Sequence, residues 1–266
     1  MTTLTESLTK IKNEAPLVHN ITNYVVMNNT ANALLAIGAS PVMAHALEEV
    51  EEIVSIAASL VINIGTLSKP WIAAMLQAAE KAKALQKPFV LDPVGAGASR
   101  LRTQTCWQLM DTYTPTVIRG NASEIMALAS EAVETKGVDS THSSERALQA
   151  AQQLALKLGN VVVISGAIDY ITNGKETIEV HHGSPLMTKV TGMGCTATAL
   201  IGAFVAVSPE VLTAAAQAML LMGKAGELTA EKVTGPGSFQ AHFLDTLYQA
   251  VEATWPNEVE MSYQNA

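Results

Sequence analysis

Apolar residues along the chain follow two alternating patterns, one strand-like and one helical. Short apolar or β-branched runs, typical of strands buried on both faces, occupy 60–64, 88–92, 116–118 and 160–164. Stretches with helical spacing predict helices over 3–13, 23–37, 47–59, 70–85, 100–113, 122–129, 143–158, 195–207, 210–231 and 238–253. This alternation predicts an α/β fold with a mostly parallel central sheet and helices on both faces.

Turn-forming and capping residues set the expected limits of these elements. Asn23 is expected to cap the helix over 23–37, and Pro70 suits the first turn of the helix that it begins. Asn173-Gly174, inside 170–180, predicts a β-hairpin. The polar segment 135–144 is expected to form a loop and the polar tail 256–266 to fray. Because no linker or repeat interrupts the pattern, residues 1–266 are predicted to form a single domain.

Composition narrows the class of protein. The chain has 266 residues, of which 48% are hydrophobic and 15% charged, enough to bury a large core. The net charge of −8 and the lack of a basic cluster argue against nucleic acid or an anionic membrane as a partner. No apolar run reaches the roughly 18–20 residues of a membrane span. With only Cys106 and Cys195, and without signal-peptide features at the start, the sequence predicts a cytoplasmic protein.

The most informative motif is Thr191-Gly-Met-Gly-Cys195, which leads into an apolar run of small residues. Glycines at a helix start let backbone N–H groups approach an anion, and the helix dipole favours negative charge there. Cys195 lies in the same turn and can accept a proton. The motif therefore indicates phosphoryl transfer, with Gly194 and Cys195 as catalytic candidates. A tight turn beside a small buried cysteine would give the same pattern without catalysis.

Polar residues follow the ends of three predicted strands, where ligands bind in open α/β sheets. Asp92 is a candidate metal ligand, directly or through water, although an Asp-Pro pair also caps loops. Arg119 is a candidate for phosphate and Glu124 for a metal, although Glu124 also has capping-box spacing from Asn121. Ser165 suits either a nucleotide phosphate or an ordinary turn.

An amide-rich segment near the start of the chain is a candidate for orienting a polar ring. It surrounds His19 and comprises Asn20, Asn23, Asn28 and Asn29, some of which are expected to cap structure instead. Met43 follows a Gly-Ala-Ser-Pro segment and is expected on a loop or short strand that lines a pocket. His181-His182 has no further ligand at metal spacing, so zinc is not expected.

Five segments, taken together and in order, closely resemble the hydroxyethylthiazole kinase family. They are PLVHNITN (16–23), NALLAIGASPVM (32–43), DPVGAG (92–97), RGNASE (119–124) and GMGC (192–195). The resemblance covers nearly the whole chain. It implies a ribokinase-like fold, ATP and Mg²⁺, and phosphorylation of the primary alcohol of 4-methyl-5-(2-hydroxyethyl)thiazole in thiamine salvage. It also implies a homotrimer with active sites at the subunit interfaces.

The resemblance also implies roles for single residues. It places the substrate contacts at Asn23, Met43 and Gly192, the ATP contacts at Arg119 and Ser165, and the magnesium-side acids at Asp92 and Glu124. Cys195 stands where related sugar and vitamin kinases carry an aspartate base. Two positions depart from the family pattern: Met193 replaces a frequent threonine, and Ala167 replaces a frequent glutamate. The second removes a carboxylate on the metal or phosphate side.

Three other functions remain open. Another small-vitamin kinase of the ribokinase-like class, or a nucleotide-hydrate dehydratase, would usually carry aspartate in place of Cys195. A catalytically silent thiazole-binding module is disfavoured by the joint presence of Asp92, Arg119, Asn121 and Glu124. A hydrolase with a cysteine nucleophile would need a histidine partner, for which His19 is the candidate.

Overall fold

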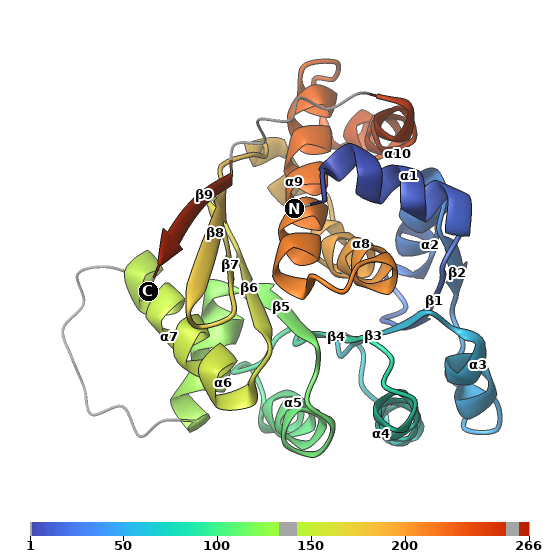
Figure 1. Cartoon of the computed structure of the whole chain (residues 1–266), viewed down its shortest axis with the longest axis vertical. Coiled ribbons are helices and arrows are strands. Elements are labelled where there is room, and N and C mark those ends of the chain that lie inside the picture. Colours follow the sequence, from blue (N-terminus) through green and yellow to red (C-terminus); the bar gives the residue numbers. More distant parts are fainter. Residues whose placement is uncertain (1, 133–142, 254–260, 266) are drawn as a thin grey trace.

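Nine strands form one sheet in the computed structural model, which describes residues 2–132, 143–253 and 261–265 (Figure 1). The sheet order is β2-β1-β3-β4-β5-β6-β7-β8-β9. Six neighbouring strands run parallel: β2 (Ser40–Val42), β1 (Leu17–Ile21), β3 (Ser59–Asn63), β4 (Phe89–Asp92), β5 (Val117–Asn121) and β6 (Val161–Ser165). Three antiparallel strands extend it: β7 (Asp169–Thr172), β8 (Glu176–Val180) and β9 (Met261–Asn265). The predicted mostly parallel sheet is confirmed.

Helices cover both faces of the sheet, as predicted (Figure 1). One face carries α1 (Leu4–Glu14), α2 (Met27–Ala36), α8 (Met193–Val207), α9 (Val211–Ala230) and α10 (Pro236–Glu252). The other carries α3 (Val50–Ile56), α4 (Lys69–Ala84), α5 (Arg100–Tyr113), α6 (Ala122–Ala132) and α7 (Ser143–Leu158). Each layer of helices encloses its own hydrophobic core against the sheet. A short 3₁₀-helix, η1 (Pro185–Lys189), lies between β8 and α8.

Local sequence signals explain several boundaries. Thr3 and Glu6 form a capping box that starts α1, and Ser68 caps α4, with Pro70 in its first turn. Helix α8 is almost entirely buried because small residues let it lie close to the sheet. A Cβ atom on Gly202 would lie 2.6 Å from the side chain of Val61 on β3. This close packing places the start of α8 at the carboxyl ends of the parallel strands.

Several predicted boundaries are wrong. Asn23 does not cap α2, which begins at Met27 after a turn, because Asn23 Oδ1 accepts the backbone N–H of Val25 and Nδ2 bonds the side chain of Asn63. The helix predicted over 47–59 shortens to α3, and Ser59 already belongs to β3. Strands β1 and β9 were not predicted, and β9 lies in the tail that was expected to fray. Most of the predicted loop 135–144 lies outside the described residues, although 143 and 144 begin α7.

Candidate active site

Asp92 lies at the centre of a buried polar network at the carboxyl end of β4. Its Oδ2 atom accepts hydrogen bonds from Asn63 Nδ2 at 2.6 Å and from Thr198 Oγ1 of α8 at 3.0 Å. Its Oδ1 atom is buried and has no hydrogen-bond partner among the described residues. Burial raises the pKa of Asp92 to about 6, against the lowering effect of Arg119 and with a further rise from Glu124. Asp92 therefore has one carboxylate oxygen left to bind a ligand.

Asn63 connects Asp92 to the substrate candidate Asn23. It is the last residue of β3 and pairs in register with Asp92 on β4. Its Oδ1 atom accepts hydrogen bonds from Asn23 Nδ2 and from the backbone N–H of Gly65, both at 2.9 Å. Asn63 and Thr198 were not singled out from the sequence. A polar residue that ends an apolar strand, the signal that identified Asp92, is also present at Asn63.

Cys195 lies next to this network, in the first turn of α8. Its Sγ atom is 3.5 Å from Asn23 Nδ2. Burial raises the pKa of the thiol to about 12, and the charge of Asp92 adds to the rise, while Asn63, Arg119 and Asn23 lower it. The thiol is therefore protonated at neutral pH, although a helix start by itself would favour the thiolate.

The start of α8 has a backbone geometry that suits the anion cradle expected there. Gly192, with φ of +85°, is the N-cap residue in the left-handed region, and the side chain of Val26 would meet any Cβ atom there at 2.8 Å. The N–H groups of the first turn have no acceptor within the helix. The Arg119 guanidinium lies against Gly194, because a Cβ atom there would lie 2.5 Å from Arg119 Nη1. A cation and free backbone donors thus share one turn, which suits a phosphate.

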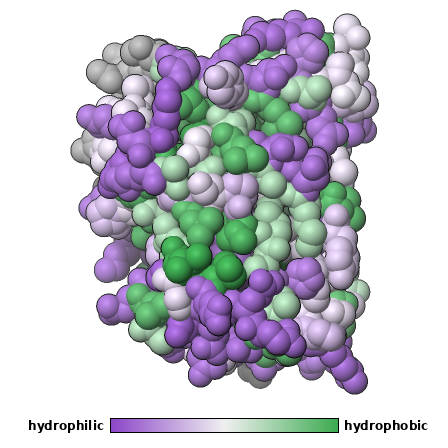
Figure 2. All heavy atoms as spheres, turned by 90° about the vertical axis from the view of Figure 1, so that its right-hand side faces the viewer, coloured by the Kyte–Doolittle hydropathy of each residue, from purple (hydrophilic) through white to green (hydrophobic). Residues whose placement is uncertain are grey.

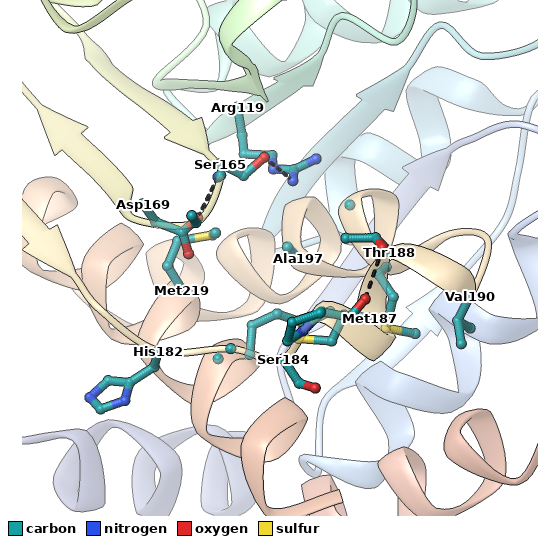
Figure 3. Close-up of a pocket in the computed structure, with 18 of the residues that line it drawn as sticks. Arg119, Ser165, Asp169, His182, Ser184, Met187, Thr188, Val190, Ala197 and Met219 are labelled. Atoms are coloured by element: carbon teal, nitrogen blue, oxygen red, sulfur yellow. Dashed lines mark hydrogen bonds between the residues drawn. The ribbon is translucent and has the colours of Figure 1, made fainter. Parts of the chain in front are cut away.

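A cavity of about 760 Å³ opens beside this cradle. Figure 3 shows Arg119 and Ser165 at one side of the cavity and Ser184 and Met187 of the β8–α8 connection at the other, with Ala197 between them. Arg119 Nη2 donates a hydrogen bond to Ser165 Oγ. Met187, Met219 and Met222 also line the cavity and give it apolar surface, with Met219 beside Asp169 in Figure 3. The cavity therefore combines donors that suit a phosphate with apolar surface.

Asp169 also lies in the wall of this cavity, although the sequence did not single it out. It is buried at the start of β7, and its Oδ1 atom accepts a hydrogen bond from Gly166 N at 2.9 Å. Burial raises its pKa to about 6, against the lowering effects of the Gly166 hydrogen bond and of Arg119. Ala167, which stands where the family often has glutamate, lines the same wall. It lies two residues before the buried carboxyl group of Asp169.

The predicted site residues separate into two groups. Arg119, Ser165, Gly192 and Gly194 line the cavity. Asn23, Asp92 and Cys195 join through the polar network beside it. Met43 follows the edge strand β2 and is half-buried. Gly194 and Cys195 are consecutive in α8, so the two groups meet at the start of this helix.

Glu124 adopts the structural role that its spacing predicted. Its two oxygens accept hydrogen bonds from the backbone N–H groups of Gly95 and Asn121, both at 2.8 Å. Asn121 Oδ1 accepts one from Glu124 N at 3.0 Å, which completes a capping box at α6. Among the described residues, no three His, Cys, Asp or Glu side chains gather as metal ligands. The free oxygen of Asp92 remains as a site for a hard cation, which favours oxygen ligands.

A phosphate cradle and a nucleotide-sized cavity at the carboxyl ends of a parallel sheet define a small-molecule kinase of the ribokinase-like class. A sequence model of the hydroxyethylthiazole kinase family matches residues 8–253. The chain is 58% identical to hydroxyethylthiazole kinase of Leptospira biflexa, over 92% of this chain and 91% of the relative. The chain therefore belongs to the hydroxyethylthiazole kinase family.

Solved structures agree with this assignment. A hydroxyethylthiazole kinase of Pyrococcus horikoshii OT3 superposes with a TM-score of 0.88 at 42% identity, over 99% of this chain and 98% of the other. A ribokinase-like superfamily protein of Enterococcus faecalis V583 superposes with a TM-score of 0.63 at 17% identity, over 94% and 95% of the two chains. The second likeness concerns the fold alone, and it confirms the ribokinase-like architecture.

Proposed function

We propose that this chain transfers the γ-phosphoryl group of ATP to the primary alcohol of hydroxyethylthiazole, as one kinase domain in thiamine salvage. The observation that carries the proposal is the junction at Gly194 and Cys195, where a nucleotide-sized cavity meets a buried polar network. Membership of the hydroxyethylthiazole kinase family supports this acceptor. Phosphoryl transfer depends mainly on positioning and on electrostatic stabilisation, and both are built into this junction.

ATP occupies the cavity in this proposal. Its phosphates lie over the backbone N–H groups at the start of α8, where Arg119 and Ser165 supply further donors. The apolar surface formed by Met187, Met219 and Met222 accepts the base and ribose. The γ-phosphoryl group then points from Gly194 toward Cys195 and Asn23.

The thiazole alcohol occupies the other side of the junction, near Asn23, Met43 and Gly192. Cys195 is the proposed proton acceptor, because it lies in the turn that holds the phosphates. A loose transition state releases the hydroxyl proton late, so the base acts only when the phosphoryl group has largely left ADP. Asn23 donates to the sulfur, which favours the thiolate, the form that accepts the proton of the alcohol. The hydrolase alternative loses support, because the His19 ring bonds to the carbonyl oxygen of Ala44 at 2.7 Å.

Magnesium fits this arrangement through Asp92, whose Oδ1 atom is buried and unpartnered. Mg²⁺ prefers a few carboxylate oxygens together with water and substrate phosphates, so one free oxygen is sufficient. When bound, the ion neutralises charge that develops on the phosphates. Glu124 is proposed to bind Mg²⁺ only through water or through a further lone pair, since both of its oxygens already accept backbone N–H groups.

A homotrimer with active sites at its interfaces is also part of the proposal. Figure 2 shows the face that carries α2, α3 and β2, and apolar side chains gather on it. Exposed apolar side chains of these helices and the adjacent turns are Tyr24, Val25, Leu35, Leu47 and Ile56. An exposed apolar patch of this kind is typical of a subunit interface. Met43 follows the edge strand at the same face, so the thiazole side of the site opens toward it.

The last part of the proposal is the cellular location. No helix of the described residues is long and apolar enough to cross a membrane. We propose a cytoplasmic location for this kinase, with ATP and the thiazole as its small-molecule partners and without nucleic acid.

The test is ADP release with Mg-ATP and hydroxyethylthiazole, run beside pyridoxal and hydroxymethylpyrimidine. Turnover with the thiazole alone supports the proposal. Turnover with one of the other acceptors instead would assign a different vitamin kinase. Tight thiazole binding without ADP release from any acceptor would make the chain a catalytically silent binding module.

A further inference from the structure

The junction between the cavity and the polar network depends on a residue that contacts neither proposed substrate directly. Asn63 is buried, with 1% of its surface exposed, and lies between Asn23 and Asp92, also buried. These three residues come from the ends of the adjacent strands β1, β3 and β4. The order of the strands in the sheet, and not their separation along the chain, brings them together.

The direction of each hydrogen bond in this row is fixed by backbone groups. The N–H of Gly65 can only donate, so the Asn63 atom that faces it is Oδ1, and Nδ2 faces Asp92. The N–H of Val25 likewise donates to Asn23 Oδ1 at 3.1 Å, so Asn23 Nδ2 faces Asn63. Two backbone N–H groups therefore determine how both side-chain amides are oriented.

This orientation has a consequence at Cys195. Asn23 Nδ2 points an N–H group at the Cys195 sulfur at 3.5 Å, because its oxygen is held by Val25. The sulfur therefore faces a donor, and its own proton must point elsewhere. The side-chain amide of Asn63 donates an N–H group to Asp92. Asn63 thus connects the proposed proton acceptor with the carboxyl group on the phosphate side.

We propose that Asn63 is a positioning residue for phosphoryl transfer, because it helps hold the Asn23 amide toward Cys195 and bonds Oδ2 of Asp92, which leaves Oδ1 of Asp92 for the proposed cation. The inference deepens the proposed function and rests on it for the reaction itself. Loss of Asn63 removes one of the two hydrogen bonds that hold each group, since Val25 N–H still bonds Asn23 Oδ1 and Thr198 still bonds Asp92 Oδ2, while the cradle at the start of α8 remains. It should therefore lower kcat more than it changes nucleotide binding.

The first test is Asn63→Ala against a matched control, Asn160→Ala. Asn160 is also buried and donates one hydrogen bond, to the carbonyl oxygen of Pro115 at 3.0 Å, but it lies at the amino end of β6. Asn63→Ala should lower kcat by about 10- to 100-fold, the usual effect of losing a group that orients a site ligand. The KM for ATP should stay within about threefold, since the cradle is retained. Asn160→Ala should leave kcat unchanged.

A second readout follows the two cysteines without turnover. Iodoacetamide labelling measured by mass spectrometry distinguishes Cys195 from Cys106, which is fully buried in α5. In folded Asn63→Ala, Cys195 should react more slowly, because its thiolate loses the stabilising contact with Asn63 and the donor Asn23 is held by Val25 alone. Cys106 should stay unlabelled. Labelling of Cys106 would show that the variant is unfolded.

Gly65→Ala tests the same link without removing a hydrogen-bonding group, and it decides the question if Asn63→Ala does not fold. Gly65 is outside the left-handed region, and an added Cβ atom would lie 2.8 Å from Asn23 Nδ2. The same fall in kcat and the same slower labelling are expected. The proposal is overturned if a folded variant keeps the kcat of Asn160→Ala, or if the labelling of Cys195 is unchanged. A wild-type chain that releases no ADP with the thiazole would refute the proposed function instead, and the labelling would still test Asn63.

Discussion

At the scale of single residues, Cys195 has two opposing influences on its thiol. The helix start and the donor Asn23 favour the thiolate, whereas burial and Asp92 oppose it and raise the pKa to about 12. The thiol is therefore protonated at neutral pH, a protonation state that the sequence alone did not establish. A proton acceptor of this kind works through a small thiolate fraction, and below the pKa that fraction increases about tenfold for each unit by which the pH rises.

Cys195→Ala should lower kcat by roughly 10²- to 10⁴-fold, the usual contribution of a general base, with little change in the KM for ATP. In the wild type, kcat should rise with pH between about 7 and 9.5, because the thiolate fraction rises, while the variant should lose this dependence. Steady-state kinetics across this range provide the measurement. Cys106→Ala, at the buried cysteine of α5, is the control and should keep the wild-type profile.

A loss of only a few-fold in Cys195→Ala, with the pH profile unchanged, would remove the base role. The backbone cradle would then be the main source of catalysis.

Asp169 offers a prediction about stability. Its pKa is raised from 3.8 to about 6, mainly by burial, so the folded chain binds this proton more tightly than the unfolded chain does. Its contribution is most favourable below pH 3.8 and is lost as the pH rises through about 6. Asp169→Asn, which can still accept the Gly166 hydrogen bond, should therefore stabilise the fold at pH 8 by about 1–3 kcal/mol and change little at pH 4.

Thermal unfolding at the two pH values measures this effect through Tm. Asp245→Asn removes an exposed carboxyl group on α10 and should shift Tm at neither pH. An equal gain for Asp169→Asn at pH 4 and pH 8 would contradict the titration argument.

At the scale of secondary-structure elements, α8 determines where the chemistry takes place. Its small residues let it lie against β3, and its first turn reaches the ends of the parallel strands. The same turn presents the cradle at Gly194 on one side and Cys195 on the other. The β8–α8 connection, with η1, forms the opposite wall of the cavity. The packing of α8 therefore determines the geometry of the site, and an added side chain at Gly194 should disturb that geometry directly.

Gly194→Val should abolish most activity, because the first added carbon already lies 2.5 Å from Arg119 Nη1 and a branched side chain covers the phosphate position. A reduction of kcat/KM for ATP of at least about 10²-fold is expected, by analogy with loss of transition-state donors. Gly237→Val at the start of α10 is the control, since an added Cβ atom there meets nothing within 4 Å. Near-normal turnover of Gly194→Val would refute the cradle.

At the scale of the whole molecule, the cavity and the proposed thiazole side lie beside different strands of the sheet. The cavity is lined by Arg119 of β5, Ser165 of β6 and Asp169 of β7, while the proposed thiazole side lies toward β1 and the edge strand β2. Only the second region adjoins the face with exposed apolar side chains in Figure 2. Association through that face would enclose the acceptor and leave the nucleotide cavity within a single chain.

The proposed trimer predicts a specific activity that falls on dilution as subunits separate. The double variant Leu35→Glu with Ile56→Glu introduces charges on α2 and α3, where both side chains are exposed, and should yield an inactive single chain of 28.0 kDa. Light scattering with gel filtration measures the mass. Leu101→Glu, at an exposed leucine on α5, should leave mass and activity unchanged. Full activity of the double variant as a monomer would exclude an interface site.

The sequence by itself determined the alternation of strands and helices, the hairpin at Asn173-Gly174 and the glycine-rich start of α8, because these depend on local periodicity, turn chemistry and glycine spacing. It also marked Asp92 and Arg119 through their places at strand ends. Only the tertiary structure decided that Asn63 lies between Asn23 and Asp92 and that Asp169 enters the cavity, because the order of strands in a sheet is a long-range property. The direction of the Cys195 pKa shift is likewise tertiary, since burial outweighs the local helix start there.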